Sequence, residues 1–207
     1  QTFRFAAEPF FFSQEKQHNS RKTYADVLKY FTILASLIFL SVMLYLDVVK
    51  HFVGSSFHSK EGIEIVPILL MANLFLGIYY NLSIWYKLTE KTVYGAILAI
   101  FGAVITIILN IILIPKIGFI GSAWATLFCY FSMMIASLLM GRKYYAIPYD
   151  LKRVFTYIFL SFALYKISVY FETSMLINTV YLFVFIIAVF VLEKSKKEVI
   201  SEPELFD

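Results

Sequence analysis

The chain has 207 residues, of which 60% are hydrophobic and only 15% are charged, and its formal net charge is +4. Soluble domains are roughly 45–50% apolar and about a quarter charged, so this chain has too few polar side chains to cover a soluble globule. A single cysteine, Cys129, excludes a secreted disulfide scaffold. The composition therefore predicts an integral membrane protein.

Apolar runs long enough to cross a bilayer follow one another along the chain. They cover residues 27–49, 63–86, 92–114, 119–140, 151–171 and 175–192. About 20 apolar residues in a helix cross the hydrocarbon core, and lipid offers no hydrogen-bond partner to a non-helical backbone. The sequence thus predicts an all-α fold, a polytopic membrane bundle with six transmembrane helices.

Short connections join these runs into antiparallel neighbours. The turns are residues 87–91, 115–118 and 171–174. In the second of them, Pro115 is expected to end a helix and Gly118 to permit a tight reversal.

The basic residues are divided unequally between the two predicted membrane faces. Most of the 18 lysines and arginines lie on one face: Arg4, Lys16, Arg21, Lys22, Lys29, Lys87, Lys91, Arg142, Lys143, Lys152, Arg153, Lys194, Lys196 and Lys197. The other face carries Lys50, Lys60 and Lys116, and Lys166 lies inside a span. The positive-inside rule then places both termini in the cytoplasm, and the net positive charge indicates this membrane face rather than a nucleic-acid surface.

The predicted organisation has five parts. Residues 1–26 are the end of a truncated helix and a cytoplasmic loop, and residues 27–140 hold four transmembrane helices. Residues 141–150 are a cytoplasmic link, residues 151–192 hold the last two transmembrane helices, and residues 193–207 are a cytoplasmic tail.

Polar residues within the predicted spans are the candidate functional residues, because such side chains are costly in lipid. Asn73 and Tyr80 share one helix face with Gly77, and Asn81 flanks them. Either direct contact with a substrate or hydrogen bonds between helices explain these residues. Lys166 has two interpretations as well, an ion-coupling role or a side chain that snorkels outward to the interface.

Small and aromatic residues predict how the helices pack and how deep they lie. Gly95, Ala99 and Ala103 recur every four residues, and Gly121 and Ala125 repeat this spacing, which lets helices approach closely in lipid. A set of aromatic residues is expected at headgroup level: Trp85, Tyr86, Tyr144, Tyr145 and Tyr149.

No catalytic pattern appears in the sequence. It contains no Ser-His-Asp set, no paired carboxylates inside a span and no zinc-ligand spacing. We therefore expect a protein that is not an enzyme, with no catalytic residue, metal or cofactor.

One segment carries a family resemblance. The stretch LNIILIPKIGFIGSAWATLFCY (109–130) has an Asn before an apolar run, then Pro, two glycines three apart, small residues and Ala-Thr. It resembles a recurrent segment of bacterial polysaccharide biosynthesis proteins, and residues 77–96 and 141–154 look like the segments on either side of it. These proteins are the oligosaccharide-lipid flippases of the multidrug/oligosaccharidyl-lipid/polysaccharide exporter superfamily.

The resemblance implies a fold larger than this chain. Family members have two six-helix lobes and two extra C-terminal helices, fourteen helices in all. The six predicted spans would be the C-terminal lobe plus these two helices, which makes the chain a fragment whose partner is the missing N-terminal lobe of the same protein.

The resemblance also implies a function, which is to move undecaprenyl-diphosphate-linked oligosaccharide across the bacterial inner membrane for polysaccharide biosynthesis. The lipid bilayer and the lipid-linked oligosaccharide are then the expected partners, with no nucleic acid. Arg4 and Glu8 would lie at the cytoplasmic mouth of the pathway, and Asn73, Tyr80 and Asn81 would line its wall. Arg4 and Glu8 have a second interpretation, an interfacial ion pair four residues apart.

Two other functions stay open from the sequence. A drug or cation exporter of the same superfamily would be favoured by an acidic residue deep inside a span. A membrane-embedded glycosyl- or acyltransferase would be favoured by a carboxylate or histidine set on a cytoplasmic loop.

Overall fold

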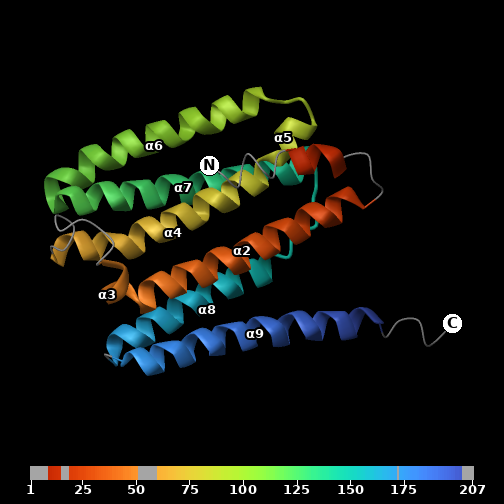
Figure 1. The fold of residues 1–207 in the computed structure, drawn as a ribbon. Coiled ribbons are helices and arrows are strands. Elements are labelled where there is room, and N and C mark those ends of the chain that lie inside the picture. The colour runs from red at the N-terminus through yellow and green to blue at the C-terminus, as the bar shows by residue number, and fades with distance from the viewer. Residues whose placement is uncertain (1–8, 15–18, 51–59, 172, 202–207) are drawn as a thin grey trace.

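The chain folds into long helices joined by short turns. The computed structural model describes residues 9–14, 19–50, 60–171 and 173–201, and Figure 1 shows them as an all-helical bundle. Its long helices are α2 (Ser20–Leu44), α4 (Lys60–Leu82), α6 (Val93–Ile117), α7 (Phe119–Tyr144), α8 (Leu151–Tyr170) and α9 (Met175–Ser201). Two short helices, α3 (Leu46–Val49) and α5 (Ile84–Leu88), extend α2 and α4.

Five stretches of the described chain are long and apolar enough to cross a membrane. They are Ser20–Leu44, Gly62–Leu88, Val93–Ile117, Phe119–Tyr144 and Met175–Lys194. The chain is thus a multi-pass helical membrane protein, and the prediction of six spans is confirmed for five. The remaining segment forms α8, but Lys152, Arg153 and Lys166 interrupt its apolar character, and its passage through the membrane stays a prediction.

Several helix ends differ from the predicted limits. The first long helix begins at Ser20 and breaks at Tyr45 before α3. The helix expected to stop at Pro115 continues to Ile117 and ends at Gly118, which has φ +63°. The expectation for Pro115 was wrong because proline cannot donate to the helix but leaves the next residues free to bond, whereas the positive φ at Gly118 turns the chain.

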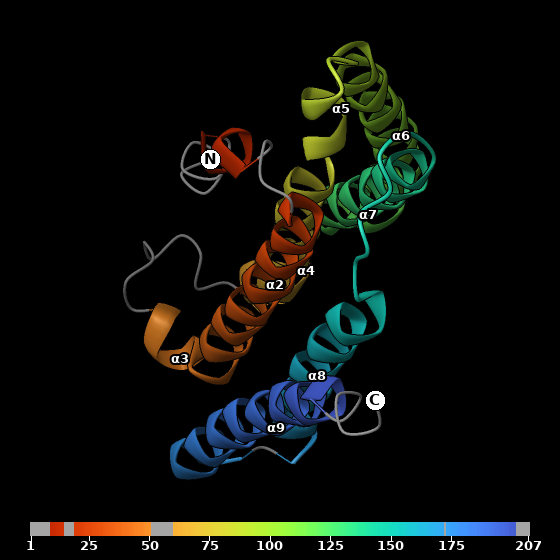
Figure 2. The same cartoon turned by 90° about the vertical axis from the view of Figure 1, so that its right-hand side faces the viewer.

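The long helices form two groups. One group packs α7 against α4 and α6, and the other packs α2 against α8 and α9. Contacts between α2 and α4 connect the groups, and Figure 2 shows α8 and α9 set apart from α6 and α7. Helix α2 therefore lies at the junction of the bundle.

Close approach of α6 to α7 depends on glycine, at the predicted Gly121 and at Gly102. A Cβ on Gly102 would overlap the Met133 side chain, and one on Gly121 would lie 2.7 Å from the backbone carbon of Leu113. Ala99 and Ala103, which the four-residue repeat placed in the same interface, are exposed. The repeat was wrong at these positions because the buried stripe of α6 runs through Leu98 and Gly102 instead.

One end of the bundle collects the predicted cytoplasmic residues. The start of α2, the end of α7, the start of α8 and the end of α9 lie at the same end in Figure 1. The structure thus brings together Lys29, Arg142, Lys143, Arg153 and Lys194 at one end. Which side of the membrane this end faces stays a prediction from the positive-inside rule.

Candidate functional site

Helix α8 has two chemically different faces. Its buried face carries Val154, Tyr157, Ile158, Ser161, Leu164 and Ser168. Phe155, Phe159, Phe162 and Lys166 recur every three or four residues on another face, which is the spacing of one helix stripe. Most of the first face packs against other helices, and the second lines a large open space, to which Ile158 and Ser168 of the first face also contribute.

This space is a groove between the two helix groups, with a volume of about 1300 Å³. We call it the α4–α8 groove. Its walls come from the end of α2 with α3, from α4 and α7, and from α8. The side chains that line it include Met43, Leu44, Asp47, Glu64, Pro67, Ile68, Met71, Phe75, Trp124, Phe131, Lys152, Phe155, Phe159, Phe162, Tyr165, Lys166 and Asn178.

The walls of the groove are mainly aromatic and aliphatic. On one side the rings of Phe75 and Phe131 lie 5.2 Å apart and join α4 to α7. On the α8 side, Phe155, Phe159 and Phe162 are 42%, 73% and 38% exposed. In a bilayer such side chains lie against lipid chains, which are as apolar as they are, so the groove suits a ligand with a long apolar part.

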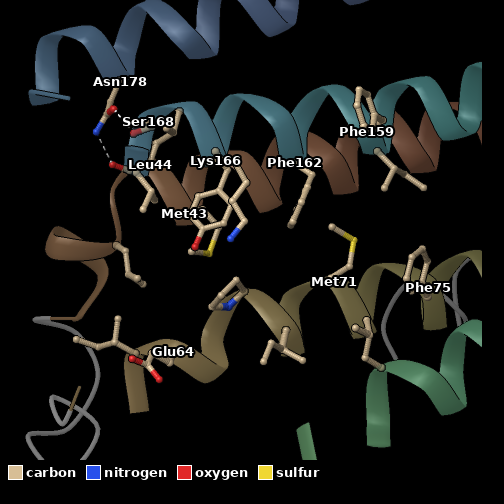
Figure 3. A pocket seen from close by; sticks show the side chains of 18 of the residues that line it. Met43, Leu44, Glu64, Met71, Phe75, Phe159, Phe162, Lys166, Ser168 and Asn178 are labelled. Atoms are coloured by element: carbon tan, nitrogen blue, oxygen red, sulfur yellow. Dashed lines mark hydrogen bonds between the residues drawn. The ribbon is translucent and has the colours of Figure 1, made fainter. Parts of the chain in front are cut away.

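Charged groups lie at the ends of this apolar surface. Figure 3 shows Lys166 reaching from α8 into the groove toward α4, with Glu64 on the opposite wall. Asp47 lies at the same end and pairs with Lys50 at 2.6 Å, while Lys152 lines the groove at the other end of α8. The groove therefore combines an apolar middle with charged ends.

Hydrogen bonds hold the Lys166 end of the groove in place. Asn178 of α9 donates from Nδ2 to the Leu44 carbonyl at 2.9 Å and accepts from the Ser168 hydroxyl at 2.8 Å. The Thr173 hydroxyl donates to the same Asn178 oxygen at 2.6 Å. One amide thereby ties α9 to α2 and to α8 beside the groove.

The residues predicted to line a pathway lie elsewhere. Asn73 is exposed on α4 and donates to the Leu69 carbonyl at 2.8 Å, and buried Asn81 donates to the Gly77 carbonyl at 3.0 Å. Both bonds stay within α4, so neither is the bond between helices that the sequence left open. Tyr80 packs against the core cluster of α4 and α7.

These residues do not line the α4–α8 groove as the structure describes it. Arg4 and Glu8, the candidates for the pathway mouth, lie outside the described residues. Of the candidates taken from the sequence, Lys166 is the one that the structure brings to the groove.

A second charged site lies at the opposite end of α8, where the carboxylate of Glu193 is the centre. It accepts from Lys29 Nζ at 2.8 Å, from Arg153 Nη1 at 2.9 Å and from the Tyr157 hydroxyl at 2.6 Å. Asp26 and Asp150 lie 3.4 Å from the same two cations. This Glu193 cluster links α2, α8 and α9.

Sequence reasoning missed this cluster and the stripe on α8. It counted Lys29 and Arg153 as basic residues of one membrane face and left Glu193 aside, although a carboxylate at the end of an apolar run is itself a signal. The three-and-four spacing of Phe155, Phe159, Phe162 and Lys166 was readable too. Only the fold shows that this stripe faces a groove.

The aromatic residues expected at headgroup level are partly interior. Trp85 is buried and stacks on Tyr144 with ring centroids 5.4 Å apart, while Tyr94 donates a 2.6 Å hydrogen bond to Tyr144. Trp85 thus joins α5, α6 and α7 as a packed side chain. The Tyr149 hydroxyl in the link before α8 is also buried, and this burial raises its pKa.

Neither a metal site nor a related protein identifies the function of this chain. Within the described ranges, no group of three His, Cys, Asp or Glu side chains is placed to hold a metal ion. No protein-family model, curated protein or solved structure matches this chain.

Proposed function

We propose that this chain belongs to a membrane transporter that moves an undecaprenyl-diphosphate-linked oligosaccharide across the bacterial inner membrane for polysaccharide biosynthesis. In this proposal α8 is a sixth span, both termini are cytoplasmic, and the chain is the C-terminal part of a fourteen-helix flippase. The missing N-terminal lobe of the same protein is then its partner.

The α4–α8 groove is the observation that carries the proposal. A lipid-linked sugar has a long apolar chain and a charged, hydrated headgroup, and the headgroup must cross about 30 Å of hydrocarbon. The groove offers an apolar middle for the chain and charged residues at its ends for the headgroup. The family resemblance of residues 77–96, 109–130 and 141–154 supports the same substrate class.

The division into two helix groups supports a transport mechanism. Transporters expose a site to alternate sides when one bundle rocks against another. Here the groups meet mainly through α2 and α4, so small rotations about that junction would widen or narrow the groove. The substrate headgroup would pass along the charged ends while its chain stays among apolar side chains.

A reconstitution experiment tests this function. The product of the complete gene is placed in vesicles that contain a lipid-linked oligosaccharide with a fluorescent label on the sugar, and a membrane-impermeant reductant is added outside. Transfer between leaflets brings inner-leaflet label to the reductant, so we expect nearly complete loss of fluorescence.

Two results from these vesicles would contradict the proposal, one from the sugar label and one from a separate dye-uptake measurement. Loss of the outer-leaflet label alone, as in vesicles without protein, would overturn transfer of this substrate. Uptake of a cationic dye in the absence of oligosaccharide transfer would favour the exporter that the sequence left open.

A further inference from the structure

We propose that the α4–α8 groove binds a membrane lipid by its phosphate, and that Lys166 is the residue that contacts this phosphate. Phe155, Phe159 and Phe162 would hold the apolar chain of the same lipid. This inference rests on the proposed function, because it assigns the phosphate end of that substrate class to one side chain.

The order of residues along α8 matches a lipid with an anionic head. Three phenylalanines follow one another on the stripe that lines the groove, and Lys166 comes one turn after the last of them. At 1.5 Å per residue, Phe155 and Lys166 lie about 16 Å apart along the helix. The stripe thus presents a long apolar surface with a cation at one end, which is the complement of a lipid with an anionic head.

The Lys166 ammonium lies beside aromatic rings. In the part of the chain that the structure describes, Lys166 forms no ion pair. The rings of Tyr165 and Phe162 lie 5.5 and 5.6 Å from its Nζ, and these contacts stabilise the cation without neutralising it. A phosphate supplies the missing negative charge, and lysine binds phosphate as a point charge.

Carboxylates near Lys166 favour a lipid phosphate over a free phosphate. Glu64 lies on the wall opposite Lys166, and Asp47 lies at the same end. The Glu64 carboxylate repels a small anion that enters from water, whereas Asp47 is paired with Lys50. The chain of a lipid phosphate anchors it among the phenylalanines and the surrounding hydrocarbon, whereas inorganic phosphate would have to leave water without such an anchor.

Photolabelling in vesicles tests the site. The full chain is incorporated into phosphatidylcholine vesicles with a polyprenyl phosphate that carries a diazirine on its chain, and labelled peptides are mapped by mass spectrometry. We expect labels on groove residues such as Phe131 and Phe159. Polyprenol with the same diazirine should label them roughly tenfold less, which is the change expected from losing one charge-assisted hydrogen bond.

Variants separate Lys166 from general membrane charge. Lys166→Gln should reduce phosphate-lipid labelling to the level of polyprenol, and Lys166→Arg should retain it. Lys116→Gln, which removes an exposed lysine from the end of α6, should leave labelling unchanged. The comparison of the two lipids on the unaltered chain keeps the test valid if Lys166→Gln does not fold.

Three results would overturn the inference. The first is equal labelling by polyprenol and polyprenyl phosphate, and the second is unchanged labelling of Lys166→Gln. The third is loss of labelling when inorganic diphosphate is added, which would mean that the site binds a free anion. Labelling needs no sugar and no transfer, so a chain that binds the lipid but fails the reconstitution assay contradicts the proposed function alone.

Discussion

Glu193 shows how one side chain can hold three helices. Its two carboxylate oxygens accept hydrogen bonds from Lys29 on α2 and from Arg153 and Tyr157 on α8. Lys29 is buried, so its charge depends on this partner more than a solvated lysine would. Helix α9 is also held by the apolar cluster around Phe185, by the amide of Asn178 and by a 2.6 Å hydrogen bond between the hydroxyls of Thr179 and Tyr45.

Replacing this carboxylate should weaken the fold. Glu193→Gln leaves Lys29 and Arg153 without their shared anion, and we expect a loss of about 2 kcal/mol of stability in the folded state. The midpoint of thermal unfolding should fall by roughly 4–8 °C. The measurement uses a fluorogenic thiol reagent, because Cys129 is the sole cysteine and is buried until the protein unfolds.

The control for this experiment is Glu90→Gln, the same substitution at an exposed position. It should not change the midpoint. An unchanged midpoint in Glu193→Gln would mean that the cluster contributes nothing net to stability, as occurs for many partly exposed ion pairs.

At the scale of the elements, α8 differs from its neighbours. It has one buried face, one face of phenylalanines on the groove, and charged residues near both ends. This mixture explains why α8 is not among the five stretches that are long and apolar enough to cross a membrane. A helix that borders a groove can carry more polar residues than one surrounded by lipid, since water and ligand reach it.

We predict that α8 spans the membrane. In a Cys129→Ser background, Pro148→Cys before the helix and Phe171→Cys after it should react with a membrane-impermeant maleimide from opposite sides. Under the predicted orientation position 148 reacts from the cytoplasm. Reaction of both positions from the same side would show that α8 enters and leaves by one face, and the bundle would then have five spans.

At the scale of the whole molecule, the relation between the two helix groups matters most. The groove lies between α8, which packs mainly on α2, and the helices α4 and α7 on its other side. If transport requires the groups to move, a covalent link across the groove should stop it. A link within one group should have no such effect.

Crosslinking tests this requirement. Ile68→Cys on α4 and Phe162→Cys on α8, joined by bifunctional maleimides of graded length, should reduce oligosaccharide transfer to the level of vesicles without protein. The control links α6 to α7 within one group through Tyr94→Cys and Tyr144→Cys. The hydroxyls of these two tyrosines lie 2.6 Å apart in the unaltered chain. This link should retain transfer. Full transfer by the bridged groove would argue against movement of the groups.

The sequence predicted the helices better than their arrangement. Runs of about 20 apolar residues indicate membrane helices because in lipid the backbone must form all its hydrogen bonds within the helix. Five of the six runs are candidate spans. Local rules failed where packing decided the outcome, at Ala99 and Ala103, and at Pro115.

Long-range pairing was beyond such rules. Nothing in the spacing of residues indicates that Glu193 reaches Lys29, or that the phenylalanines of α8 face α4 across an open groove. Lys29 and Glu193 are 164 residues apart in the chain. The position of α8 opposite α4 depends on how the surfaces of all the helices fit together.

The position of α2 has a consequence for how the protein is made. Helix α2 is near the start of the chain, yet one of its principal partners, α8, is synthesised after α4, α6 and α7. Until then its buried hydroxyl residues, Thr32 and Ser36, and the lysine at position 29 have no α8 or α9 to cover them. A ribosome that stops before α8 would therefore release a chain with a polar stripe open to lipid, which is the kind of intermediate that membrane quality control recognises and degrades.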